Sequence, residues 1–299
     1  MKIVIAGGTG FIGKKLTELL LENGHDIVCL TRKAQPSNSR VTYIKWLQHG
    51  ACPEKEINEA DAFINLAGVS INDGRWNESH QKQIYDSRMK ATNELLRIIA
   101  ALAVKPAVLV NASAIGIYPA SNVAIYTEDS KEVAADFLGK TVCDWEKKAE
   151  SVNALGIRPV YMRFGVVLGR EGGALPLMVL PYKLFGGGTV GSGRQWVSWV
   201  HVQDVVRAIV FALEHQALKG PVNVTAPTQV KMEDFGRTIA SVLHRPHWLP
   251  VPEFALKMAL GKKSALVLEG QHVIPVKLME EQFAFLFPTL EGALNDLLI

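Results

Sequence analysis

The fold of this chain is decided by a short stretch near its N-terminus, Ile3-Val4-Ile5-Ala6-Gly7-Gly8-Thr9-Gly10-Phe11-Ile12-Gly13. The apolar run at 3–6 predicts a strand buried on both faces. Leucines at 16, 19, 20 and 21 then recur with helical spacing. Glycines at 7, 10 and 13 therefore occupy a tight turn between a strand and a helix, with G-x-x-G-x-x-G spacing.

A glycine-rich turn of this kind is typical of dinucleotide-binding sites. Because glycine has no Cβ atom, the backbone comes close to a pyrophosphate, which the free N–H groups of the helix start also face. Any tight strand-to-helix turn needs glycine, so the spacing alone is weak evidence. Since this turn follows a strand and opens a helix, we predict a cofactor site made of Gly7, Thr9, Gly10, Phe11, Ile12 and Gly13.

The end of the second predicted strand, at 26–31, indicates which cofactor binds. A site for NAD usually has Asp or Glu there to bind the ribose 2′-hydroxyl. This chain has Thr31, Arg32 and Lys33 instead, and two cations with a hydroxyl suit a 2′-phosphate. The alternative is that Arg32 and Lys33 only form a solvated turn. We predict that the cofactor is NADP(H).

Strand and helix patterns then alternate along the chain. Predicted strands at 41–46, 61–68, 107–111 and 158–169 are interleaved with predicted helices at 77–102 and 137–154. This alternation predicts an α/β fold with a doubly wound parallel Rossmann sheet. The predicted strand at 61–68 ends in Leu66-Ala67-Gly68. Small residues there would let an adenine or ribose lie against the backbone; close helix packing explains Gly68 equally well.

The later part of the chain predicts a second, smaller region. We expect residues 1–168 to form the NADP-binding domain, to which 195–225 return with a strand at 222–224. Residues 169–194 and 226–299 are expected to form a mixed α/β carboxyl-terminal substrate region. Glycines at 186–188, 191 and 193 predict a mobile substrate loop presenting Lys183, Arg194 and Gln195; simple loop composition is the alternative.

Composition excludes several classes of protein. The 299 residues are 48% hydrophobic and 20% charged, with a net charge of +3. That is too mild a charge to predict nucleic-acid or membrane binding, and no apolar run is long enough to span a bilayer. Three scattered cysteines offer neither a disulfide framework nor a metal site. We expect a cytoplasmic protein without metal, and leave a homodimer open.

Taken together, the motifs resemble the extended short-chain dehydrogenase/reductase superfamily, in particular the epimerase-family branch of its atypical members, with a carboxyl-terminal region of the DUF1731 type. The stretches that carry this resemblance are Gly7 to Gly13, Asn65-Leu66-Ala67-Gly68, Gly74-Arg75-Trp76, Ser87-Arg88, Ser113 with Tyr118, Asp144-Trp145-Glu146, Gly191-Ser192-Gly193-Arg194-Gln195, Trp199 to Asp204 and Leu268-Glu269-Gly270-Gln271. The resemblance implies a nicotinamide cofactor, which Arg88 and Val167 would also contact; a plain surface ion pair is the alternative for Arg88.

One departure from the superfamily matters for chemistry. The resemblance implies a Tyr-x-x-x-Lys pair, in which Lys lowers the Tyr pKa and Tyr passes a proton as hydride moves. None of the six tyrosines is followed by Lys four places later. Aligning Glu146 with the Glu that usually follows this Lys puts Leu138 and Val142 at the two positions. The usual proton donor is therefore missing.

Ser113 and Tyr118 are the predicted catalytic residues, since both follow the strand at 107–111. The alternative for Tyr118 is an ordinary half-buried aromatic, and Lys140 or Asp144 would be the next candidates. His201 is left out, because it is structural as often as functional in relatives. We expect an NADP(H)-dependent oxidoreductase or nucleotide-sugar-epimerase-like enzyme acting on a small polar substrate. The alternative is a non-catalytic NADP(H)-binding sensor or partner-binding protein.

Overall fold

A computed structural model describes residues 1–33 and 35–299 of the chain. Its strands are β1 Lys2–Ala6, β2 Asp26–Thr31, β3 Val41–Lys45, β4 Ala62–Asn65, β5 Val108–Ala114, β6 Ile125–Tyr126, β7 Arg158–Phe164, β8 Val166–Leu168, β9 Trp196–Val197, β10 Trp199–His201, β11 Gly220–Val224, β12 Val230–Lys231 and β13 His272–Val273. The α-helices are α1 Phe11–Glu22, α2 Glu54–Ile57, α3 Glu78–Ala101, α4 Phe137–Glu150, α5 Leu175–Lys183, α6 Val202–Glu214, α7 Met232–Leu243, α8 Glu253–Leu260, α9 Ala265–Leu268, α10 Val276–Glu280 and α11 Leu290–Leu298. Short 3-10 helices are η1 Ile115–Ile117, η2 Ser151–Leu155 and η3 Gly261–Ser264.

Within the described residues, seven parallel strands form the central sheet in the order β11-β7-β5-β4-β1-β2-β3. The chain starts in the middle with β1, builds outward to β3, and then returns through β4 to the other edge. The order reverses between β1 and β4, which is where open α/β sheets bind ligands. The predicted doubly wound Rossmann sheet is confirmed.

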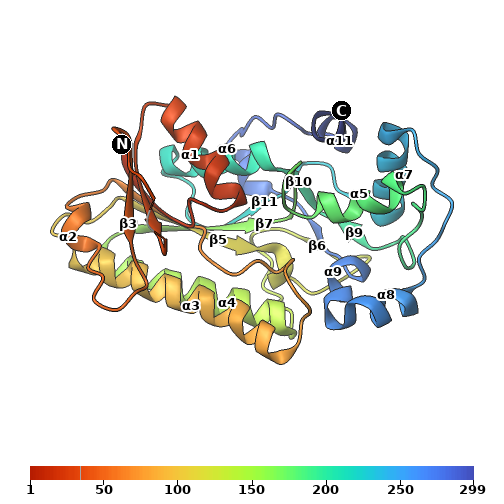
Figure 1. Cartoon of the computed structure of the whole chain (residues 1–299), viewed down its shortest axis with the longest axis horizontal. Helices are drawn as coiled ribbons and strands as arrows, with labels where there is room; N and C mark the ends of the chain where they lie inside the picture. The colour runs from red at the N-terminus through yellow and green to blue at the C-terminus, as the bar shows by residue number, and fades with distance from the viewer. Residues whose placement is uncertain (34) are drawn as a thin grey trace.

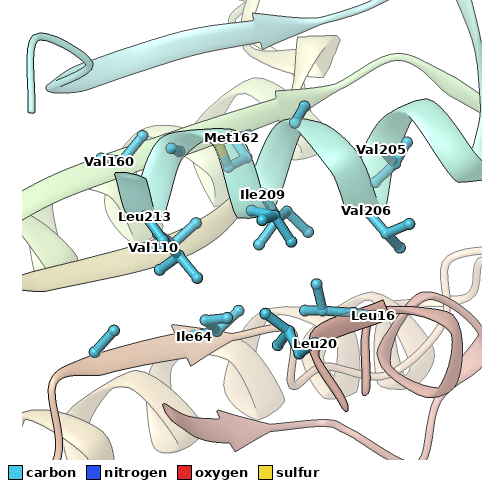
Figure 2. Close-up of a cluster of buried hydrophobic side chains, with 14 of the residues drawn as sticks. Leu16, Leu20, Ile64, Val110, Val160, Met162, Val205, Val206, Ile209 and Leu213 are labelled. Atoms are coloured by element: carbon cyan, nitrogen blue, oxygen red, sulfur yellow. The ribbon is translucent and has the colours of Figure 1, made fainter. Parts of the chain in front are cut away.

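Helices cover both faces of this sheet (Figure 1). On one face, Leu16 and Leu20 of α1 and Ile209 of α6 pack against strand residues such as Ile64 and Val110 (Figure 2). On the opposite face, α3 and α4 cover a second core. Strand residues are apolar on both faces, as expected of a parallel sheet between two helical layers.

A third core lies at one end of the sheet and belongs to the later part of the chain (Figure 1). It joins α5, α7 and α11 around the fully buried Trp199 and Phe235. The sequence did not predict α5 or α7 as helices. For α5 the reason is that it contains Pro181 and precedes a glycine-rich stretch.

The predicted strand at 158–169 is broken at Gly165. The Gly165 N–H donates to the Val224 carbonyl in the sheet, whereas the next N–H, of Val166, donates to Ser198. The chain thus leaves the sheet as β8 and pairs with β10. A Cβ atom at Gly165 would collide with the Ser198 carbonyl oxygen, so this change of partner requires glycine.

None of the helices formed by residues 1–33 and 35–299 has both the length and the hydrophobicity needed to cross a membrane.

Candidate functional site

The glycine turn lies at the reversal point of the sheet, between the end of β1 and the start of α1. Gly7 has a φ of +85°, and a Cβ there would lie 2.8 Å from the Leu66 carbonyl carbon. A Cβ at Gly13 would lie 2.7 Å from the Gly8 Cα atom. Gly7 and Gly13 are therefore required by close packing of the turn against β4 and against itself.

Gly10 is different, because it is exposed and a Cβ there would be crowded on one side alone. Among the described residues, a Cβ at Gly10 would meet a single neighbouring atom within 4 Å, the Gly7 carbonyl oxygen at 3.3 Å. Gly10 is the N-cap of α1, and no side chain in the described part of the chain caps this helix. Thr9 and Gly10 are exposed, and Phe11 and Ile12 are half-buried. An exposed helix start without a side-chain cap has backbone N–H groups that suit an anion.

Sequence reasoning missed the role of Gly8. A Cβ there would come within 2.7 Å of the Cys29 Sγ atom on the neighbouring strand β2. Burial raises the pKa of the Cys29 thiol to about 11, which keeps it neutral beneath the turn. Two consecutive glycines were the available signal, because the first is needed for its φ and the second for packing.

The end of β2 presents two cations. The Thr31 hydroxyl is buried and donates to the Lys33 carbonyl at 3.0 Å, while it accepts the Lys33 N–H at 3.2 Å. The Thr31 hydroxyl thus shapes the turn that carries Lys33, and its contact with a cofactor stays a prediction. Arg32 and Lys33 are exposed, and the Arg32 carbonyl is held by the Gln48 side chain at 2.6 Å.

A second missed residue, Asn65, holds the segment after β4. Its amide nitrogen donates to Thr92 Oγ1 at 3.0 Å and to Asn111 Oδ1 at 2.7 Å, and its Oδ1 accepts the Ala67 N–H at 3.2 Å. Asn65 is fully buried. Its side-chain partners come from α3 and β5, so Asn65, at the end of β4, fixes the Leu66-Ala67-Gly68 segment relative to both.

Arg88 of α3 lies directly against Gly68. A Cβ at Gly68 would be 3.2 Å from the Arg88 guanidinium carbon, so this glycine makes room for an arginine. Arg88 Nη1 donates to the Val69 and Ile84 carbonyls at 3.1 and 3.0 Å, and the guanidinium lies 5.1 Å from the Trp145 ring centroid. Burial lowers the pKa of Arg88 to about 10.

In the described residues, Arg88 forms no ion pair with a carboxylate. A guanidinium that is desolvated but lacks an anionic partner is stabilised by any anion that reaches it. The structure therefore favours a ligand contact at Arg88 over the alternative of a surface ion pair.

Ser113 belongs to a buried polar cluster formed by Ser113, Tyr118, Glu146, Arg163 and Asn223. Ser113 Oγ donates to Glu146 Oε1 at 2.5 Å. Arg163 donates to both Glu146 oxygens at 2.9 and 2.8 Å, and its Nη1 donates to the Tyr118 hydroxyl at 2.7 Å. Burial acts to lower the pKa of Arg163, yet its bonds to Glu146 raise it above its ordinary value. The Ser113 hydroxyl is engaged inside the protein.

Tyr118 is also inside this buried polar cluster, with 0% of its surface exposed. Its hydroxyl lies 2.9 Å from both the Thr127 carbonyl oxygen and Asn223 Oδ1, in addition to its bond from Arg163. Burial raises the pKa of Tyr118, although Arg163 acts to lower it. Both hydroxyls of the predicted catalytic pair are thus buried and hydrogen-bonded within the protein, and their catalytic role stays a prediction.

The face of α4 toward the end of β5 is apolar where it carries Leu138 and Val142. Leu138 contacts Gly116, and Val142 is buried in an apolar cluster with Ile115. The other candidates on α4 point elsewhere: Lys140 is exposed, and Asp144 Oδ2 accepts the Tyr85 hydroxyl at 2.9 Å.

The predicted substrate loop divides into anchored and exposed residues. Gln195 is buried and donates to the Val190 and Val267 carbonyls at 3.0 and 2.8 Å, so it holds the loop and does not face a ligand. Lys183 and Arg194 are exposed, and Val167 is half-buried. His201 caps α6 by accepting the Gln203 N–H at 3.1 Å, in agreement with a structural role.

The parallel sheet, the uncapped glycine turn at its reversal point and the nearby cations define a Rossmann-type dinucleotide-binding protein of the extended short-chain dehydrogenase/reductase kind. The chain belongs to the NAD dependent epimerase/dehydratase family, whose sequence model matches residues 3–225. A domain of unknown function, DUF1731, matches residues 251–297. The resemblance drawn from the sequence is thus confirmed.

Relatives match along the whole chain. Epimerase family protein YfhF of Bacillus subtilis is 50% identical over 299 residues, which are 100% of this chain and 98% of the relative. Among solved structures, human epimerase family protein SDR39U1 with NADPH has a TM-score of 0.88 at 34% identity and covers 99% of each chain. UDP-glucuronic acid 4-epimerase from Bacillus cereus, in complex with NAD, shares the fold, with a TM-score of 0.79 at 18% identity over 99% of this chain and 96% of its own.

Proposed function

We propose that this protein binds NADP(H) at the glycine turn and uses it in an oxidoreductase or epimerase-like reaction on a small polar substrate. The observation that carries the proposal is the exposed Gly10 at the start of α1, which no side chain among the described residues caps. Backbone N–H groups there suit a pyrophosphate, and the helix dipole adds to the attraction.

The surrounding residues fit the rest of such a cofactor. Exposed Arg32 and Lys33 would hold a 2′-phosphate, the segment Leu66–Gly68 would lie along the dinucleotide, and Arg88 would meet a phosphate or ribose. The NADPH bound to human SDR39U1, 34% identical to this chain, supports the choice of NADP(H). When bound, the nicotinamide would supply or accept the hydride.

A second function is favoured by one specific observation. Leu138 and Val142 make the adjoining face of α4 apolar, and the Ser113 and Tyr118 hydroxyls are engaged in the buried polar cluster. Proton transfer would then depend on another residue or on the substrate itself. Without one, the protein would be an NADP(H)-binding sensor that performs no turnover.

The first experiment is a calorimetric titration of the protein with NADPH and with NADH. We expect NADPH to bind at least about tenfold more tightly, a difference of about 1.4 kcal/mol. Equal affinities would contradict the choice of cofactor, and no binding of either would contradict the site itself.

The second experiment separates the enzyme from the sensor. Metabolites that raise the melting temperature of the NADPH-loaded protein are tested for NADPH oxidation or epimerisation. Turnover of one of them supports the enzyme. Tight NADPH binding with no turnover of any stabilising metabolite supports the sensor. Leu138→Tyr is a useful companion variant, since it adds a hydroxyl beside Gly116; a lysine at Val142 would instead be buried among apolar side chains.

A further inference from the structure

The aromatic ring of Phe11 lies on three glycines that are far away in the sequence. A Cβ at Gly172 would lie 2.6 Å from Phe11 Cδ2 and 2.7 Å from Cγ, and one at Gly169 would lie 2.8 Å from Cε2. A Cβ at Gly173 would be 3.5 Å from Cε1. We call Gly169, Gly172 and Gly173 the glycine cradle. The ring fits there because Gly169 and Gly172 have no side chains.

The glycine cradle connects the sheet to the carboxyl-terminal core. It follows β8, closes on it through the bridge between Leu168 and Gly173, and leads into α5. Two further contacts meet there. Asn72 of the segment after β4 donates to the Gly173 carbonyl at 3.3 Å, and Arg170 donates to the Asp296 carbonyl of α11 at 3.0 Å.

Phe11 is also the first residue of α1, within the turn that would bind the pyrophosphate. Its backbone thus belongs to the cofactor site and its side chain to the cradle. A ligand that fixes the N-terminal turn of α1 also fixes the Cα atom from which the Phe11 side chain extends. Rigid packing then carries this restraint into the cradle and α5, because a packed contact transmits a shift that a loose one would absorb.

We propose that Phe11 is a positioning residue that couples cofactor binding to the order of the carboxyl-terminal region. This inference rests on the proposed NADP(H) site. The cofactor that occupies the glycine turn stabilises the glycine cradle and α5 through the Phe11 ring, so the substrate side of the protein opens less often once the cofactor is bound. By reciprocity, ordering of α5 strengthens cofactor binding.

Hydrogen exchange measured by mass spectrometry tests the coupling. In the wild type, saturating NADPH should slow exchange of the amides at 170–183 by about fivefold or more, in addition to those of the glycine turn. In Phe11→Ala, NADPH should bind more weakly, but at a concentration that saturates the variant it should protect the turn and leave 170–183 unchanged. A residue with a merely structural role would speed exchange with and without NADPH alike, and would not remove the ligand-dependent difference.

Gly172→Ala gives an independent test, with Gly186→Ala as its matched control. The methyl group at 172 would displace the Phe11 ring, whereas one at 186 would meet its nearest neighbours at 3.8 Å. We expect Gly172→Ala, and not Gly186→Ala, to abolish the protection of 170–183. In the Phe11→Ala background the same methyl group has room, so Gly172→Ala should then have little effect on the unfolding midpoint.

The outcomes distinguish this inference from the function on which it rests. If the wild type fails to bind NADPH, the proposed function and the coupling both fall. If NADPH binds and protects the turn, but 170–183 respond equally in the wild type and Phe11→Ala, only the coupling is overturned. Additive effects of Phe11→Ala and Gly172→Ala on the unfolding midpoint would also overturn it.

Discussion

The turn after β1 and the buried polar cluster at the end of β5 both lie at the carboxyl ends of the sheet's strands, but their polar groups are arranged in opposite ways. The turn leaves the N–H groups of the α1 start without a side-chain cap among the described residues and leaves Gly10 exposed. The cluster gives Ser113 and Tyr118 partners inside the protein. Polar groups left open serve a ligand, whereas polar groups that satisfy one another serve the fold.

This difference bears on how a missing proton donor is interpreted. Sequence position predicted Ser113 and Tyr118 beside the reacting end of a cofactor; Ser113 lies on β5 and Tyr118 follows η1. Their hydroxyls nevertheless stabilise an Arg163–Glu146 ion pair between β7 and α4. Hydrogen-bond satisfaction, more than nearness in the sequence to a motif, separates site residues from scaffold residues here.

The largest expected effect comes from breaking the buried polar cluster. Arg163→Leu would leave the Glu146 carboxylate buried without its partner, so we expect a loss of about 3–5 kcal/mol in the free energy of unfolding. Arg97→Leu is the control, because Arg97 pairs with Glu54 and Glu94 on the surface and should cost at most about 1 kcal/mol. Urea denaturation measures both. Similar losses for the two variants would contradict a scaffold role for the cluster.

The second prediction breaks the turn without breaking the fold. Gly10→Val puts a branched side chain at this exposed position, so NADPH affinity should fall by about a hundredfold or more, or about 2.7 kcal/mol. Gly10 has an extended backbone with φ −78°, which valine can adopt. The free energy of unfolding of the variant should therefore change by about 1 kcal/mol or less.

Gly13→Ala should also disturb the fold, since its Cβ would collide with the backbone of Gly7 and Gly8. We expect it to lose stability together with binding. Normal NADPH titration by folded Gly10→Val would show that the cofactor lies elsewhere.

The sequence predicted the sheet because periodicity and glycine placement are local signals. Ile3–Ala6, the turn and α1 are contiguous, and their geometry follows from residue type alone. The exchange of partners at Gly165 was not predictable, since it depends on Ser198 and Val224, which approach only after folding. Asn65 was missed for the same reason: its partners Thr92 and Asn111 come from other elements.

The third prediction tests the cations at the end of β2. Arg32→Asp should erase or invert the preference for NADPH over NADH, a change of about 1.4 kcal/mol or more, because a carboxylate repels a 2′-phosphate and binds a 2′-hydroxyl. Lys90→Asp, which makes the same charge change on an exposed face of α3, should leave the ratio unchanged. Equal shifts in both variants would indicate a general effect of net charge.

The fourth prediction concerns the Tyr118 hydroxyl. Tyr118→Phe removes one member of the buried polar cluster and leaves Asn223 and Arg163 each short of a partner, so we expect a loss of about 1–2 kcal/mol in unfolding free energy. Because the hydroxyl does not reach open space, NADPH affinity should stay within about twofold of the wild-type value. A large loss of affinity at unchanged stability would return Tyr118 to the functional site.

The smallest expected effect lies at the rim of the cluster, where Glu128 accepts the backbone N–H groups of Asn223 at 3.0 Å and Lys277 at 3.3 Å through Oε1. Its other oxygen is buried and has no hydrogen-bond partner among the described residues. Burial raises the pKa of Glu128 above its ordinary value of 4.5, although the backbone N–H groups act to lower it.

Between pH 4.5 and the raised pKa, the Glu128 carboxyl is therefore protonated in the folded protein and ionised in the unfolded chain. In that window the stability falls as pH rises, and above it the loss is complete. Glu128→Gln keeps an acceptor oxygen and cannot ionise, so it should be more stable than the wild type at neutral pH. This advantage should shrink as the pH falls toward and below 4.5, where the wild-type carboxyl becomes neutral in both states. Urea denaturation across this range, with exposed Glu280→Gln as control, measures it; a difference that stays constant with pH would mean that folding does not raise the pKa of Glu128.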